Sequence, residues 1–363
     1  MSPARRRYAI LTEGYLTDRH AKTAHGVMQY AADDVIGVID SAHAGRDVAE
    51  VVPRLRRQAP IVADLRQLLD RAPTSLLIGV ATAGGIVPAG FREQILQAID
   101  AGLEVVSGLH ELLTDDPEYV SRARRSGARL WDVRVAPQVP LFSGAAYAAP
   151  QIVALAVGSD CAIGKMSVML ELERSARAVG CNAQFVATGQ TGIMIAGQGI
   201  AVDRVISDFV SGAAEQLVLE VPANIDFALV EGQGSIHHPA YAPVTLGLMF
   251  GCAPDLLVLC HQAGRGAIDD FDVPIPDLAS LARAHEALLA PVKSASCVAV
   301  ALNTSSLDDA AARAAIAAAE AVTGLPADDP VRYGGAKLWA AVEKASERTP
   351  KRRRRSDASL AAR

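Results

Sequence analysis

The chain has 363 residues, a hydrophobic content of 50% and a formal net charge of -5 at pH 7. The length suits about two domains of ~150 residues each, and an acidic balance argues against nucleic acid as the main partner, because phosphate backbones are bound through a basic face. Aromatic residues make up only 4%, which favours parallel strands covered by helices over an antiparallel sandwich.

Strand-like and helix-like segments alternate through the first half of the chain. The expected strands are residues 8–11, 35–39, 75–80 and 103–106, and residues 91–101 have helical spacing. Such alternation predicts an open parallel sheet, so we assign residues 1–145 to a Rossmann-like domain. Residues 81–85 read A-T-A-G-G, which is not a G-x-G-x-x-G fingerprint. We therefore interpret this segment as a tight strand-to-helix turn, with dinucleotide binding only weakly supported.

A second α/β domain follows a proline-containing linker at residues 135–150. Its expected strands are residues 152–157, 184–187, 227–230, 256–260 and 298–302, and its expected helices are residues 165–179, 277–289 and 307–322. The last helix should begin near Ser306 as its N-cap and end at Gly324. We predict that this domain spans residues 151–343. Residues 344–363 are charged and predicted to form a disordered tail, serving solubility or weak electrostatic association.

The clearest chemical signal is a buried strand that runs into a glycine-bounded loop, then Gly-Lys, then a helix. This order aims backbone N–H groups and a helix N-terminus at one point, which suits a phosphate. We predict a P-loop NTPase-like site for ATP and Mg²⁺, in which Lys165 neutralises the phosphates and Ser167 contacts the metal. The residues predicted to bind the nucleotide here are Gly158, Ser159, Asp160, Cys161, Ala162, Ile163, Gly164, Lys165, Met166 and Ser167.

Two features of this loop depart from the common motif. Five residues separate Gly158 from Gly164, and Met166 occupies the usual Ser/Thr position, with Ser167 one step later. The five-residue spacing and the G-S-D start resemble dethiobiotin synthetase and related amidoligases.

The strand at residues 227–230 also looks like one in those enzymes, because it ends in an acid and a glycine-rich turn, E-G-Q-G-S. A carboxylate at the end of a strand beside a phosphate loop is where a Mg²⁺ ligand is needed. Glu231 is therefore the first predicted metal ligand and Asp160 the second. Each could instead be structural, Glu231 as a plain strand-ending acid and Asp160 as the cap of its own turn.

Three motifs together extend the resemblance over most of the chain. They are G-S-D-C-A-I-G-K-M-S, then V-A-T-G-Q-T-G-I, then E-G-Q-G-S-I-H-H-P-A-Y. With the Rossmann-like first half, they are similar to a two-domain family of unknown function that includes proteins assigned as D-glutamate N-acetyltransferases. This resemblance implies acyl transfer to an amino group, and acetyl-CoA becomes a possible ligand of the loop.

Several polar residues follow other predicted strands. Thr188, Gln190 and Thr191 are expected to contact substrate or the γ-phosphate, or to form a hydrogen-bonded turn. His237 and His238 could orient a carboxylate or move a proton, or be ordinary loop histidines. His261 is a further active-site candidate, and Arg265 in a glycine-flanked loop could clamp a carboxylate or phosphate.

Three more positions carry open alternatives. Asp203 and Asp208 could serve the metal or an amino group, or face solvent. Asn303 ends the last predicted strand, where its amide could read the edge of adenine or brace the turn into the next helix. In the dethiobiotin synthetase group, a similarly placed Asn reads the base.

The cysteine pattern and the N-terminus bear on location. None of the five cysteines falls in a C-x-x-C pair, which indicates free thiols in a reducing compartment. The first residues lack the apolar core of a signal peptide, and no stretch reaches the roughly 18 apolar residues of a membrane span. We predict a cytoplasmic protein, without nucleic-acid or membrane partners, that forms a homo-oligomer.

These features lead to one principal hypothesis and three alternatives. The principal one is an ATP- and Mg²⁺-dependent enzyme that activates a carboxylate and forms an amide on an amino-acid substrate. The alternatives are a small-molecule kinase, an acetyl-CoA-dependent N-acetyltransferase that splits no ATP, and a nucleotide-switched partner protein.

Overall fold

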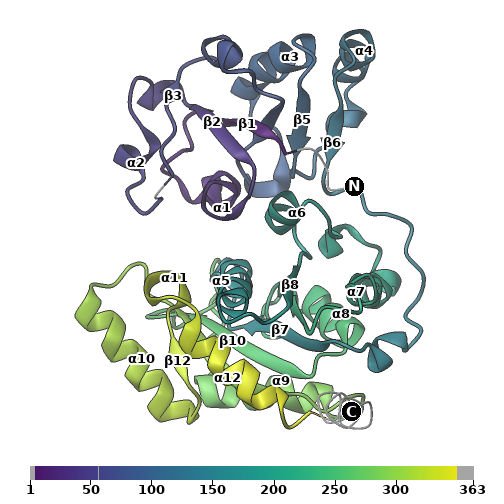
Figure 1. Cartoon of the computed structure of the whole chain (residues 1–363), viewed down its shortest axis with the longest axis vertical. Helices are drawn as coiled ribbons and strands as arrows, with labels where there is room; N and C mark the ends of the chain where they lie inside the picture. The colour runs from purple at the N-terminus through teal and green to yellow at the C-terminus, as the bar shows by residue number, and fades with distance from the viewer. Residues whose placement is uncertain (1–4, 56, 350–363) are drawn as a thin grey trace. The chain divides into compact units, whose positions relative to one another are not determined.

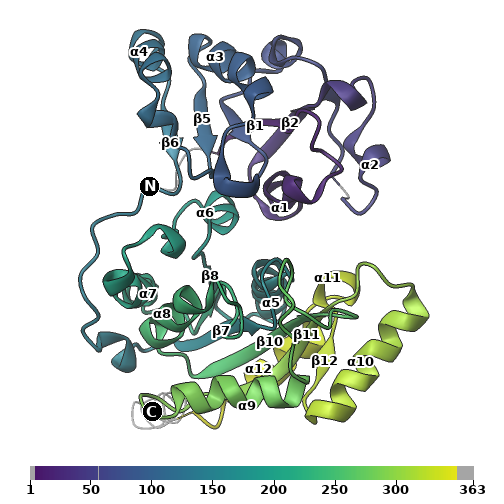
Figure 2. The same cartoon turned by 180° about the vertical axis from the view of Figure 1, so that it is seen from behind.

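Two six-stranded sheets, each wholly parallel, organise the computed structural model, which describes residues 5–55 and 57–349 (Figures 1 and 2). The first of two compact units contains the chain up to Ala136 together with Gln190–Ala201. The second contains Pro137–Gly189 and the chain from Val202 onward. This architecture confirms the predicted α/β class. Among the described residues, no helix is long and apolar enough to cross a membrane.

The sheet of the first unit has the order β3-β2-β1-β4-β5-β6. Its strands are β1 (Arg7–Leu11), β2 (Asp34–Ile39), β3 (Ile61–Val62), β4 (Ser75–Ile78), β5 (Glu104–Ser107) and β6 (Leu130–Asp132). The order reverses between β1 and β4, which is the arrangement of Rossmann folds. The four predicted strands are all present, because short apolar runs can be buried on both faces of a parallel sheet.

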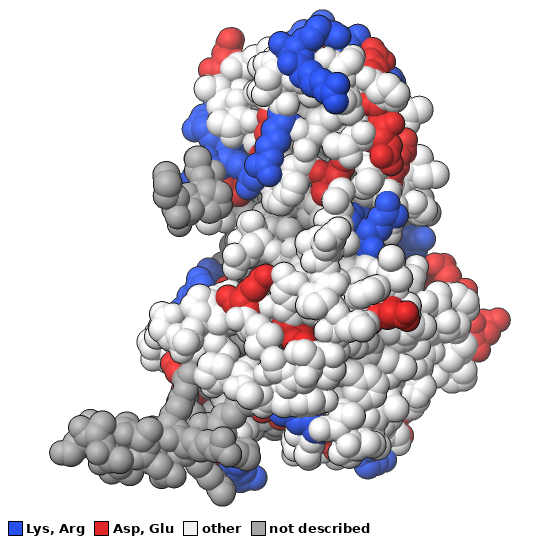
Figure 3. Space-filling view, turned by 90° about the vertical axis from the view of Figure 1, so that its right-hand side faces the viewer, with Lys and Arg blue, Asp and Glu red and all other residues white. Residues whose placement is uncertain are grey.

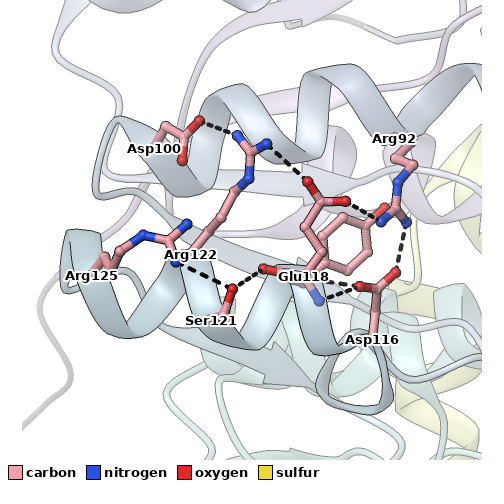
Figure 4. A network of polar contacts seen from close by, with 8 residues as sticks. Arg92, Asp100, Asp116, Glu118, Ser121, Arg122 and Arg125 are labelled. Carbon is pink, nitrogen blue, oxygen red and sulfur yellow. Dashed lines mark hydrogen bonds and ion pairs between the residues drawn. The ribbon is translucent and has the colours of Figure 1, made fainter.

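Short helices flank this sheet. They are α1 (Lys22–Tyr30), α2 (Val48–Val51), α3 (Arg92–Asp100), α4 (Pro117–Ser126) and α6 (Gln190–Ala196). Arg92 at the start of α3 bonds both Asp116 and Glu118 of α4 at 2.6 Å, and Arg122 joins Glu118 to Asp100 (Figure 4). These partners are solvent-exposed, so each ion pair adds little to stability.

The carboxyl end of β2 carries Asp40, at the position where dinucleotide-binding folds place an acid for the ribose. Asp40 is fully buried here. Its carboxylate accepts a hydrogen bond from the Leu16 backbone N–H at 3.1 Å and contacts His43 Nδ1 at 3.0 Å. The acid thus fastens two loops of the unit together.

The second sheet has the order β12-β11-β10-β7-β9-β8. Its strands are β7 (Ile152–Gly158), β8 (Ala183–Val186), β9 (Phe227–Val230), β10 (Leu256–Gln262), β11 (Ser296–Asn303) and β12 (Ala327–Asp328). All seven residues of β7 are buried, because this strand lies inside the sheet, paired with both β9 and β10.

Seven helices of the described residues cover this second sheet. They are α5 (Lys165–Ala178), α7 (Val210–Leu219), α8 (Ala242–Cys252), α9 (Leu278–Leu289), α10 (Asp309–Thr323), α11 (Pro330–Tyr333) and α12 (Ala336–Ser346). Helix α5 packs against α11 and α12, and α7 packs against α8. Four helices were not expected from the sequence in this unit: α7, α8, α11 and α12.

Two predicted boundaries differ from the structure. Helix α10 is capped by Asp308, whose Oδ1 accepts from the Ala311 N–H at 2.8 Å, and not by Ser306. It ends at Gly324 as expected, with φ of 69°. The predicted tail begins at Lys344, yet α12 continues to Ser346, which is fully buried. Residues 350–363 of that tail lie outside the described residues.

On the face drawn in Figure 3, basic and acidic side chains are interspersed among large uncharged areas. No continuous basic surface is visible on that face. This distribution accords with the small net negative charge.

Candidate functional site

Several of the polar residues singled out in the second half of the sequence gather at one edge of the second sheet. Strands β7, β9 and β10 are neighbours and run parallel, so their carboxyl ends open on the same side. The loops that follow them begin at Ser159, Glu231 and Ala263. In open α/β sheets this edge is where ligands bind.

The loop between β7 and α5 has the backbone of an anion site. Ala162 and Gly164 have positive φ, 54° and 105°, and α5 begins directly afterwards at Lys165. Gly158 is tightly packed, because a Cβ there would lie 3.1 Å from the Cys260 carbonyl oxygen. The N–H groups of the first turn of α5 have no acceptor within the helix, so this end of α5 attracts negative charge.

Lys165 lies inside this loop. It is only 6% exposed, and its Nζ donates to the Asp160 carbonyl oxygen at 2.5 Å. Burial lowers the pKa of its ammonium group, while nearby Cys161, Cys260, Asp160 and Glu231 act in the opposite direction. A desolvated ammonium beside free helix N–H groups is strongly attracted to a phosphate or another anion.

Asp160 organises the loops around this lysine. Its Oδ2 accepts from Arg265 at 2.7 Å and from the Asp269 N–H at 2.9 Å, and its Oδ1 accepts from the Cys161 N–H at 2.6 Å. The carboxylate is fully buried. Asp160 therefore joins the loop after β7 to the loop after β10. The alternative considered from the sequence, a cap of its own turn, accounts only for the bond to the Cys161 N–H.

Metal binding at this point meets an obstacle. Within the described part of the chain, Asp160, Cys161 and His238 form the one group of three with ligand atoms within 4.8 Å of one another. However, His238 Nδ1 accepts the Ala240 N–H at 3.1 Å, so Nε2 carries the proton in the neutral ring. That N–H faces Asp160 Oδ1 at 3.9 Å, whereas a metal needs a lone pair there.

Glu231 is buried, and one oxygen of its carboxylate is already engaged. Oε2 accepts from the backbone N–H groups of Thr188 and Gly189, both at 3.0 Å. Burial raises the pKa of this carboxyl to about 7, although these two bonds and Lys165 oppose the rise. A half-protonated acid bonded in this way fits poorly as a Mg²⁺ ligand. With Ser167 one residue past the usual hydroxyl position, the predicted metal set lacks support.

The T-G-Q-T-G segment is divided between the two units. Thr188 lies in the second unit, where its Oγ1 donates to the Glu231 carbonyl oxygen at 2.8 Å and accepts from the Gln233 side-chain amide at 3.1 Å. Gln190 and Thr191 begin α6, which belongs to the first unit. Thr191 Oγ1 lies 3.2 Å from Thr23 Oγ1 of α1. The chain therefore passes from the second unit to the first between Gly189 and Gln190, and the residues from Gln190 onward form a short helix.

Other predicted residues have structural partners. Asn303 Oδ1 accepts the Ser305 N–H at 3.1 Å, as the turn-bracing alternative requires. His237 is half-buried after β9, and its Nδ1 has no hydrogen-bond partner within the described residues. Asp203 lies in a short 3-10 helix, Val202–Arg204, and its charge raises the pKa of Glu231. Asp208 lies in another, Ser207–Phe209. The assignments of Asn303, His237, Asp203 and Asp208 to ligand binding stay predictions.

Two aromatic residues near this edge, Tyr241 and Phe271, were assigned no role from the sequence, and His261 was named only as a further candidate. Ser159 Oγ lies 2.9 Å from His261 Nδ1. Tyr241 and Phe271 contact the His238 ring, with centroids 4.5 and 5.2 Å from it. Both aromatic side chains are substantially exposed. Tyr241 is the last residue of the E-G-Q-G-S-I-H-H-P-A-Y motif, whereas Phe271 lies in no motif, so only the folded chain shows that they meet at His238.

Comparison with known proteins identifies relatives along nearly the whole chain. A family model described as the P-loop domain DUF1611_C matches residues 140–339, and the Rossmann-like DUF1611_N matches residues 41–136. A protein of Tritonibacter scottomollicae named D-glutamate N-acetyltransferase is 36% identical, over 89% of this chain and 94% of its own. One from Pseudoalteromonas with the same name is 41% identical over 53% of this chain and 57% of its own.

A solved structure is also similar. The crystal structure of a DUF1611 family protein from Anabaena variabilis superimposes with a TM-score of 0.89 at 38% identity. The match covers 94% of this chain and all of that one.

Proposed function

The chain belongs to the DUF1611 family, with its N-terminal Rossmann-like and C-terminal P-loop domains, and on that premise we propose that it is an N-acetyltransferase acting on an amino acid. The acceptor class would be acidic amino acids, with D-glutamate first, because two relatives carry that activity in their names. The donor would be acetyl-CoA, whose phosphates offer the anionic groups that the loop after β7 is built to bind.

One observation carries the choice of donor. The loop presents a buried lysine and a helix N-terminus, while both carboxylates predicted for Mg²⁺ are already bonded to N–H groups. ATP-dependent phosphoryl transfer depends on a divalent cation that bridges the phosphates. A thioester donor needs the anion site but not the cation. The same arrangement thus favours CoA over the ATP-dependent amide formation predicted from the sequence.

In this proposal each residue contributes binding or placement. Lys165 and the loop N–H groups hold a phosphate of the donor. Arg265 uses one nitrogen to bond Asp160, and its other N–H groups would pair with a substrate carboxylate. The acceptor amine attacks the thioester carbonyl, a C–N bond forms and the C–S bond breaks. The acceptor ammonium group loses one proton to solvent before the attack, and its nitrogen loses a second proton, which goes to the departing thiolate.

Acetyl transfer can be measured directly. Purified protein is given acetyl-CoA with D-glutamate, L-glutamate or D-aspartate, and both free thiol and N-acetyl product are followed, the latter by mass spectrometry. A parallel reaction contains acetate, ATP and Mg²⁺, and ADP is measured. We expect thiol and product in equal amounts without nucleotide. Product that appears only with ATP and ADP release would instead restore the ligase hypothesis, and ADP without an amide would indicate a kinase or a switch.

Lys165→Ala tests the anion site in the same assay. Loss of one phosphate contact at a buried site is expected to reduce kcat/KM by on the order of 100-fold. Lys337→Ala is the matched control, since that lysine is 45% exposed and pairs with Glu320 on the surface. A folded Lys165 variant as active as this control would contradict the loop's role.

The remaining predictions concern the protein's surroundings. Five cysteines without disulfides are consistent with the predicted cytoplasmic location. We also propose that the protein forms a homo-oligomer and binds neither nucleic acid nor membrane. Light scattering of the purified protein gives its molar mass and so tests the oligomeric state.

A further inference from the structure

His261 is attached to the start of the phosphate-binding loop from two sides. It lies near the end of β10, next to Cys260, whose carbonyl oxygen accepts the Ser159 N–H at 3.1 Å. Its own Nδ1 lies 2.9 Å from Ser159 Oγ. The imidazole is therefore held beside the loop by both the backbone and a side chain of one residue.

The hydroxyl of Ser159 decides which nitrogen of the ring carries the proton. Ser159 is only 1% exposed, so its O–H must be satisfied within the protein. Among the described residues, His261 Nδ1 is the acceptor available to it. The hydroxyl then donates to Nδ1, which leaves the proton of the neutral ring on Nε2.

The charge and exposure of His261 suit a neutral hydrogen-bond donor. Burial, with a smaller effect of Arg265, lowers the pKa of this imidazole from its ordinary value of 6.5, so the ring is uncharged at neutral pH. Nε2 has no hydrogen-bond partner within the described residues, and the side chain is half-buried, not closed off.

The neighbouring histidines do not offer the same group. His238 also carries its proton on Nε2, but that N–H faces Asp160 and the residue is only 3% exposed. His285 is fully buried in α9. His237 is half-buried after β9 and its Nδ1 is without a partner among the described residues, but no side chain fixes its tautomer. His261 is thus an imidazole at this edge with a fixed N–H that can reach a bound molecule.

We propose that the Nε2–H of His261 donates a hydrogen bond to the carbonyl oxygen of the acyl donor and stabilises the negative charge that develops there during acyl transfer. A fixed neutral donor of this kind needs no reorganisation as the tetrahedral intermediate forms, and losing one such donor typically costs about 100- to 1,000-fold in kcat. Ser159 is a positioning residue in this scheme, because it selects the tautomer. The inference rests on the proposed acetyl transfer.

Kinetics of two variants provide the first test. His261→Leu should lower kcat by about 100-fold and leave the KM for acetyl-CoA nearly unchanged, because the bond is made mainly in the transition state. His261→Gln keeps an N–H donor and should recover part of the loss. His43→Leu is the control, a half-buried histidine in the first unit. Normal kcat in a folded His261→Leu variant would overturn the proposal.

Nitrogen NMR provides a second test that needs no turnover. In protein with ¹⁵N-labelled histidine, the His261 resonances should show a protonated Nε2 and an unprotonated Nδ1 at pH 7. Ser159→Ala should add signals of the other tautomer. A protonated Nδ1 in the wild-type protein would refute the donor role. Wild-type protein that shows the expected tautomer but transfers no acetyl group would contradict the proposed function and not the assignment of the proton.

Discussion

At the scale of single residues, the site shows how burial changes the chemistry of an acid. Glu231 ends a strand beside a phosphate-binding loop, which is where a metal ligand is expected from sequence. In the fold it accepts two backbone N–H groups and has a pKa of about 7. The side chain predicted as a cation ligand thus also braces the turn at Thr188 and Gly189.

This brace predicts a pH-dependent contribution to stability. A carboxyl whose pKa rises from 4.5 in the unfolded chain to about 7 in the folded one stabilises the fold fully below pH 4.5. That contribution is lost as the pH rises toward 7, and a rise of roughly 2.5 units corresponds to about 3 kcal/mol. Glu231→Gln keeps an oxygen acceptor but cannot ionise, so the variant should gain stability relative to wild type as the pH rises.

Denaturant unfolding at pH 5 and pH 8 measures this effect. The difference in unfolding free energy between Glu231→Gln and wild type should move in the variant's favour by about 3 kcal/mol between these two values. Glu220→Gln serves as the control, since that carboxylate is exposed at the end of α7. If both variants follow the wild-type pH dependence, Glu231 is ionised in the fold, and its two N–H partners together with Lys165 offset the effect of burial.

At the scale of elements, the site depends on how closely the ends of β7 and β9 approach. Gly232 follows Glu231, and a Cβ on it would lie 1.8 Å from the carbonyl oxygen of Ala156 in β7 and 2.9 Å from Cδ of Lys165. No side chain can relieve a clash with a strand backbone, so only glycine fits. The spacing of two buried strands thus determines where Glu231 and Lys165 meet.

Gly232→Ala should therefore separate the two strand ends. We expect a loss of at least about 2 kcal/mol in unfolding free energy, together with weaker binding of acetyl-CoA. Gly266→Ala is a matched control on the neighbouring loop, because a Cβ there meets nothing within 4 Å. Melting curves and isothermal titration of both variants decide the matter. A Gly232 variant as stable as the Gly266 variant would mean that the strands can shift without cost.

At the scale of the whole molecule, one helix of the first unit is supplied by a segment that interrupts the second unit in the sequence. The segment Gln190–Ala201 leaves the second unit and returns at a point where the Val202 N–H donates to the Thr188 carbonyl at 3.1 Å. Within the first unit, α6 packs beside α1 (Figure 1), and its Ile193 and Met194 are buried. The apolar face of α6 is therefore covered only when the first unit is present.

A fragment consisting of residues 137–349 should expose that face. Two apolar side chains without their partner surface favour association between copies, so we expect the fragment to elute as aggregates in size-exclusion chromatography. The same fragment carrying Ile193→Ser and Met194→Ser should elute as a smaller species. A monodisperse fragment with the native residues would show that α6 finds cover inside the second unit.

Much of the fold was predictable because its signals are local. Strands such as β7 and β11 are apolar runs of the right length, and the Gly-Lys step before α5 marks the loop by residue type alone. Helix α6 was not expected, since T-G-Q-T-G was predicted to contact substrate or the γ-phosphate, or to form a hydrogen-bonded turn. Its seven residues are too few to be helical on their own, and packing against α1 supplies the stabilisation that sequence reasoning could not see.

The sequence by itself determined the α/β class, the two-domain organisation, the P-loop and the family. These follow from hydrophobic patterns and from a motif whose residues are neighbours in the chain. Only the tertiary structure decided what the polar groups do. In the fold, Asp160 accepts a hydrogen bond from Arg265, Glu231 accepts from two backbone N–H groups, and Ser159 is hydrogen-bonded to His261. The physical reason is that desolvation and hydrogen-bond partners set the role of a polar group, and residues 40 to 100 positions apart in the chain supply both.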